Sequence, residues 1–169
     1  VVSAGDTKKI KTDLGDICAE REDGTLLIQL ANPDEKQSMM KRLVENYDID
    51  GLQLDYVRYL QKTNSIDYGF DDYTISAFEA EYGCSPDDEP SKFVLFKQQQ
   101  VTEFVKACST ELKAINPDLI LSLSVYPFYQ DGKNLFMQSA ELWMSKGYGD
   151  LVVPMAYYEN QVSSITNNT

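Results

Sequence analysis

The chain has 169 residues, 43% of them hydrophobic, which is enough for one domain with a sizeable core. Its net charge of −12 and pI near 4.3 argue against a nucleic-acid partner, because phosphates require a basic surface. The sequence has no histidine, its three cysteines are scattered and no apolar run could span a membrane, so we expect no metal, no cofactor and no membrane-spanning segment.

Apolar runs separated by turn residues predict alternating strands and helices. Residues 25–31 have the pattern of a buried strand. Asn32-Pro33-Asp34 can open the next helix, because it combines a capping side chain with a proline in the first turn. A second strand is predicted over residues 51–57. Two helices then follow, one from Asp72 to a stop at Gly83 and one from Pro90 to Asn116-Pro117.

The remaining predicted elements are a strand over 119–126, a helix over 135–146 stopped by Gly147, and a strand over 151–157. This alternation indicates an α/β protein with parallel β/α units. Two architectures fit, an open doubly wound sheet and a closed eight-stranded barrel. No glycine-rich phosphate loop follows any strand, which favours the barrel. A complete barrel needs about 250 residues, so we expect residues 1–169 to form a single, truncated (β/α)8 domain.

The run Asp50-Gly51-Leu52-Gln53-Leu54-Asp55-Tyr56-Val57-Arg58-Tyr59 carries the most chemical information. Because side chains alternate along a strand, Gln53, Asp55 and Val57 are predicted to share one face, opposite that of Leu52, Leu54 and Tyr56. Asp55 is near the carboxyl end of its strand, where barrel active sites lie. We interpret Asp55 as a catalytic carboxylate. The alternative is a buried brace in which Asp55 pairs with Arg58 or with a neighbouring amide.

Two later strands add polar and aromatic groups. Ser122, Ser124 and Tyr126 share one strand face, and Met155, Tyr157 and Glu159 share another. Glycoside cleavage commonly uses two carboxyl groups. Glu159 is the expected catalytic partner of Asp55, with Asp131 as a rival and strands outside this chain as a third source. Sugar rings stack on tyrosines and their hydroxyls bond polar side chains, so the substrate-binding candidates are Gln53, Arg58, Tyr59, Tyr126 and Tyr157.

Several blocks resemble, in the same order, the bacterial glycosyl-hydrolase-like ten family: the run from Asp50 to Tyr59, residues 96–105, residues 121–127, and Trp143 with residues 150–157. The resemblance implies a TIM-like barrel of which this chain is the middle, roughly strands three to six. It also implies a carbohydrate-active enzyme, exported or envelope-associated in a bacterium, with peptidoglycan glycan strands as the leading substrate class. By this matching the strand-end residues facing the site are Asn32, Asp55, Arg58, Tyr126 and Tyr157.

A weaker likeness to family 18 chitinases leaves the activity open. That family carries Asp-Gly-x-Asp-x-Asp-x-Glu on one strand, and here Val57 stands at the catalytic glutamate position and Gln53 at an aspartate position. Valine cannot donate a proton, so either the acid comes from elsewhere or the protein binds sugar without cutting it. The chain begins at Val1 rather than Met, so we expect an export signal outside it. Exposed edges of a partial barrel would favour self-association.

Overall fold

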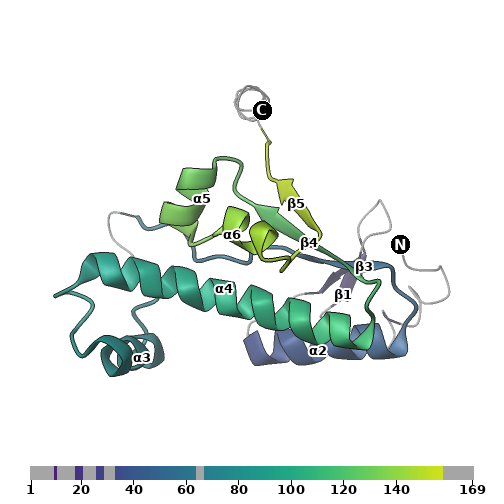
Figure 1. Ribbon diagram of the computed structural model, residues 1–169, viewed down its shortest axis with the longest axis horizontal. Helices are drawn as coiled ribbons and strands as arrows, with labels where there is room; N and C mark the ends of the chain where they lie inside the picture. The colour runs from purple at the N-terminus through teal and green to yellow at the C-terminus, as the bar shows by residue number, and fades with distance from the viewer. Residues whose placement is uncertain (1–9, 11–17, 21–25, 29–32, 64–66, 158–169) are drawn as a thin grey trace. The chain divides into compact units, whose positions relative to one another are not determined.

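The computed structural model describes residues 10, 18–20, 26–28, 33–63 and 67–157 (Figure 1). The chain divides into two compact units. The first comprises residues 1–52 and 108–120, and the second comprises residues 53–107 and 121–169. The division passes through two strands and one helix.

The first unit contains a short antiparallel pair of strands. β1 (Cys18–Glu20) pairs with β2 (Leu26–Ile28), and Ala19 lies opposite Leu27. The structure confirms a strand at the described residues 26–28, within the predicted strand 25–31. Its described neighbour β1 is antiparallel, whereas the sequence predicted parallel neighbours, and β1 itself was not predicted.

The first unit also contains the helix predicted to open at Asn32-Pro33. This helix is α2 (Pro33–Asn46), and Leu43 and Val44 of its apolar stripe are buried. The last turns of α4 (Pro90–Ile115) belong to the same unit, and there Leu112 is buried. Lys41 of α2 forms an ion pair with Glu111 of α4.

A three-stranded parallel sheet consists of β3 (Gly51–Leu54), β4 (Ile120–Val125) and β5 (Leu151–Pro154), with β4 in the middle. The register between β4 and β5 places Ser122 opposite Leu151. Gly51 is required by close approach, since a Cβ there would lie 2.5 Å from the carbonyl oxygen of Ile120. The sheet confirms a partial α/β fold, and its closure into a barrel stays a prediction.

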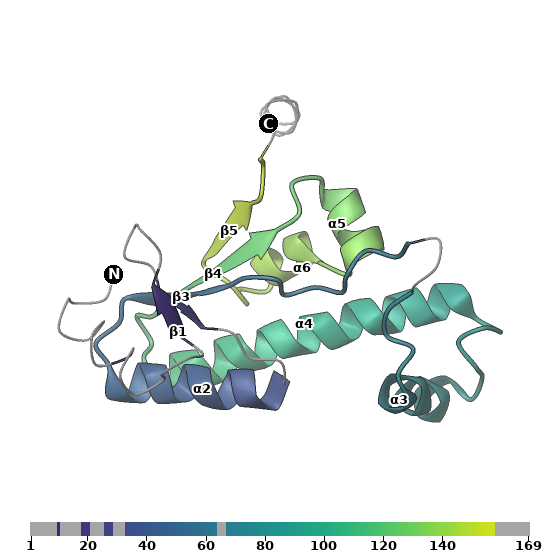
Figure 2. The ribbon, with the colours of Figure 1, turned by 180° about the vertical axis from the view of Figure 1, so that it is seen from behind.

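Two helices of the second unit have the bounds that the sequence predicts. Asp71 caps α3 (Asp72–Tyr82), and Gly83 ends it with a φ of 68°. α4 begins at Pro90 and ends directly before Asn116-Pro117. Figure 2 shows α3 beside the first turns of α4, where the two helices share a buried aromatic cluster of Phe78, Phe93 and Phe96.

The single helix predicted over residues 135–146 is wrong, because two helices occupy this region. They are α5 (Tyr129–Phe136) and α6 (Ala140–Ser145). Between them Met137 has a φ of 62°, a left-handed conformation that interrupts a helix, and the side chain of Gln138 is buried. Trp143 of α6 is fully buried, and its indole nitrogen donates a hydrogen bond to the hydroxyl of Thr102 on α4 at 3.0 Å.

Candidate functional site

The turn that follows β3 changes which side chains face solvent. β3 ends at Leu54, and Tyr56 has a φ of 55°, which is unusual for a residue with a bulky side chain. Tyr56 is 60% exposed, whereas Val57 is only 7% exposed. The predicted alternation therefore holds as far as Asp55 and fails beyond it. Val57 is buried and does not share the exposed position of Gln53 and Asp55.

Polar side chains of β3 and β4 meet on one face of the sheet, as the alternation predicts. The amide nitrogen of Gln53 donates to the hydroxyl of Ser124 at 2.7 Å, and the hydroxyl of Ser122 donates to the amide oxygen of Gln53 at 3.3 Å. On the opposite face of β4, Leu121 and Leu123 are fully buried. The sheet therefore has an apolar side in the core and a side with hydrogen-bonding groups.

Asp55 is exposed directly after the last residue of β3. One of its carboxylate oxygens accepts a hydrogen bond from the backbone N–H of Tyr56 at 2.9 Å, which fixes the direction of the carboxylate at the turn. Among the described residues, Asp55 forms no ion pair with Arg58. Of the two forms of the alternative, the pair with Arg58 is absent among these residues, whereas the contact with a neighbouring amide is present, although Asp55 is exposed rather than buried.

Arg58 instead packs against aromatic rings. Its guanidinium carbon lies 4.4 Å from the ring centre of Tyr56 and 4.6 Å from that of Phe136 on α5. The Phe136 ring also contacts Tyr126, with ring centres 4.6 Å apart, and Tyr126 in turn contacts Phe128. Tyr126, Phe128 and Phe136 therefore form an aromatic group after β4, and Arg58 joins it through Phe136.

Gln138 holds the ends of β3 and β4 together, and sequence reasoning missed it. Its side chain is 1% exposed. Its amide oxygen accepts from the backbone N–H of Tyr126 at 2.8 Å, and its amide nitrogen donates to the carbonyls of Ser124 at 3.1 Å and Val57 at 3.4 Å. One buried amide thus satisfies backbone groups of two strand ends. Nothing in the local sequence signals this role, because the contacts span 12 to 81 residues.

Tyr59 belongs to a cluster centred on a buried lysine. Lys97 of α4 is 3% exposed, donates to the carbonyl of Tyr68 at 3.1 Å, and lies 5.6 Å from the Tyr59 ring. Burial lowers the pKa of Lys97, an effect that Asp67 opposes. Burial also raises the pKa of Tyr59, so its phenol stays neutral at ordinary pH. These contacts fasten the segment after β3 to α4.

The structure describes two of the other predicted site residues and leaves two outside its described ranges. Asn32 and Glu159 lie outside the described residues. Tyr157, beyond the end of β5, is 79% exposed, and Asp131 is exposed on α5. In the described part of the chain, no group of three or more His, Cys, Asp or Glu side chains could hold a metal ion. No helix in those same ranges is long and apolar enough to cross a bilayer.

Parallel strands with polar residues and aromatic side chains near their ends define this chain as a partial α/β protein. A family model described as glycosyl hydrolase-like 10 matches residues 31–168, and the chain belongs to this family. This finding confirms the resemblance in the sequence and supports a glycosidase-like class of function. A comparison with curated proteins finds no match.

Proposed function

We propose that the protein to which this chain belongs hydrolyses a glycan of the bacterial envelope, with peptidoglycan glycan strands as the leading substrate. The observation that carries the proposal is Asp55, an exposed carboxylate that follows β3 beside the polar face of Gln53, Ser122 and Ser124. Family membership supports the same class of chemistry. An envelope substrate would require an extracytoplasmic location.

In this proposal Asp55 supplies one of the two carboxyl groups that glycoside cleavage commonly uses. Glu159, which follows β5 in the sequence, is proposed as the second, and Asp131 is its rival. Gln53 would donate hydrogen bonds to sugar hydroxyls, while Tyr126 and Tyr157 would offer ring faces to the apolar side of a pyranose.

A second candidate function is glycan binding without cleavage, and one observation favours it. Val57 stands where family 18 chitinases carry their catalytic glutamate, and here that side chain is buried while its carbonyl accepts from Gln138. Position 57 therefore belongs to the protein interior and could not present a side chain to a substrate. A barrel that had lost its acid would keep the polar face of the sheet and still bind sugar.

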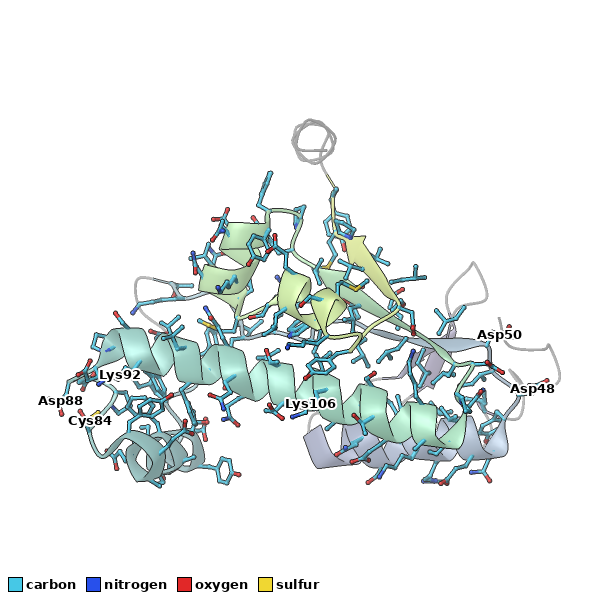
Figure 3. All side chains as sticks on the ribbon, viewed as in Figure 1. Asp48, Asp50, Cys84, Asp88, Lys92 and Lys106 are labelled. Atoms are coloured by element: carbon cyan, nitrogen blue, oxygen red, sulfur yellow. The ribbon has the colours of Figure 1, made fainter. Side chains whose placement is uncertain are left out.

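The test is Asp55→Asn in the full-length protein, assayed for release of reducing ends from purified glycan strands. The matched control is Asp48→Asn, an exposed aspartate in the connection between α2 and β3 (Figure 3). Loss of the carboxylate should lower turnover by about a hundredfold or more, while the control keeps wild-type activity. Full activity of Asp55→Asn would remove Asp55 from the mechanism. Tight binding by the wild type with no product would support the non-catalytic alternative.

A further inference from the structure

Arg58 is a partly buried cation that pairs with no carboxylate among the described residues. The chain contains 27 acidic residues, yet no described carboxylate forms an ion pair with this guanidinium. Its Nε atom is buried and has no hydrogen-bond partner. A buried donor left unsatisfied costs about 1–3 kcal/mol, so an arrangement of this kind requires a compensating role.

The aromatic contacts of Arg58 compensate for part of this cost and also hold the side chain in place. The ring centres of Tyr56 and Phe136 lie 4.4 Å and 4.6 Å from the guanidinium carbon. A ring face attracts the positive charge but offers no acceptor to the N–H groups in the guanidinium plane. These donors form the planar fork that matches a carboxylate. The rings therefore hold the guanidinium in a position from which it can bind an anion.

We propose that Arg58 binds a carboxylate carried by the glycan, so that the protein prefers chains whose sugars bear a free carboxyl group. This inference rests on the proposed function, because it names the feature of the substrate that the same site recognises. The catalytic candidate Asp55 accepts from the backbone N–H of Tyr56 and does not pair with the guanidinium. One guanidinium also balances the single charge of a carboxylate.

The experiment compares two ligands that differ in one group. The first is a tetrasaccharide of alternating N-acetylglucosamine and N-acetylmuramic acid, and the second is the same chain with each carboxyl group reduced to an alcohol. Binding to the full-length protein is measured by calorimetry. Loss of a charge-assisted hydrogen-bonded pair should weaken binding by about tenfold to a hundredfold. The preference should also decline as salt is added.

Variants of Arg58 test whether this residue causes the preference for the carboxylated chain. Arg58→Met should bind both ligands equally and with the affinity that the wild type shows for the reduced chain. Arg58→Lys keeps the charge but not the planar fork, so it should recover only part of the preference. Lys146→Met removes one exposed positive charge at the end of α6 and should keep the full preference. An unchanged preference in Arg58→Met would overturn the assignment.

If Arg58→Met does not fold, the two ligands still test carboxylate recognition with the wild-type protein alone. Equal affinity for the charged and the reduced chain would refute carboxylate recognition while leaving glycan binding intact. Binding of neither chain would refute the proposed function and, with it, this inference. The two failures are therefore distinguishable.

Discussion

Replacing Gln138 with methionine tests whether one buried amide holds the ends of β3 and β4. Methionine has a similar volume, so the change removes hydrogen bonds and leaves little cavity. Three backbone groups lose their partner: the N–H of Tyr126 at 2.8 Å, and the carbonyls of Ser124 at 3.1 Å and Val57 at 3.4 Å. The first two bonds have ordinary lengths, and each buried group left unsatisfied costs about 1–3 kcal/mol. We expect the free energy of unfolding to fall by about 2–4 kcal/mol.

Urea unfolding followed by tryptophan fluorescence measures this loss, because Trp143 is the only tryptophan and is fully buried in the same unit. Gln99→Met is the matched control, since Gln99 is exposed on α4 and the change there should stay within about 0.5 kcal/mol. A loss of less than about 0.5 kcal/mol for Gln138→Met would refute the assigned role.

Gln138→Glu separates the acceptor from the donor in the same position. Glutamate can still accept from the N–H of Tyr126, but an ionised carboxylate would face the two carbonyls. Burial would raise its folded-state pKa above the unfolded value of about 4.3. The unfolded chain then releases its proton first, so the stability of this variant relative to the wild type should decrease as pH rises above about 4.3.

Two further predictions concern the core and the sheet. Burial, with Glu111 adding a smaller effect, raises the pKa of the Cys108 thiol to about 12 from an ordinary value of 9.0. The thiol of the unfolded chain therefore ionises at a lower pH than the folded one, and the wild type loses stability as pH rises. Between pH 8 and about pH 10.5, the unfolding free energy of the wild type should fall by about 2 kcal/mol more than that of Cys108→Ala. Equal losses in the two proteins would contradict this prediction. Gly51→Ala places a Cβ against the Ile120 carbonyl and should speed amide exchange of Ile120, whose N–H donates to Asp50 at 2.9 Å. Unchanged exchange would show that the sheet accommodates the methyl group.

The local signals in the sequence predicted the bounds of α3 and α4. Asp71 and Gly83 delimit α3, and Pro90 opens α4, because caps, stops and proline act on the backbone of their own turn. Strand parity also placed Gln53 and Asp55 on one face of their strand and Ser122 and Ser124 on one face of theirs. The contact between Gln53 and Ser124 additionally required β3 and β4 to be neighbours, which parity does not show.

The features that were predicted wrongly or missed depend on contacts between residues distant in sequence. Residues 135–146 have helical periodicity, but the left-handed Met137 splits them into two helices, and the buried Gln138 between them bonds strand ends. The role of Arg58 was equally hidden, because its ring partner Phe136 lies on α5. Propensity and periodicity describe the chain one window at a time, so a long-range partner leaves no signal within it.

The turn at Tyr56 also limits where the second carboxylate of a hydrolase can lie. In the chitinase pattern, the glutamate follows an aspartate by two positions on one strand, so both side chains share a face. Here β3 ends at Leu54 and the left-handed Tyr56 intervenes, so position 57 is buried. A glutamate at position 57 would be buried and would not share the exposed position of Asp55. If Asp55 is catalytic, its partner has to come from another segment of the protein, and the proposed candidates are Glu159, which follows β5 in the sequence, and Asp131 on α5.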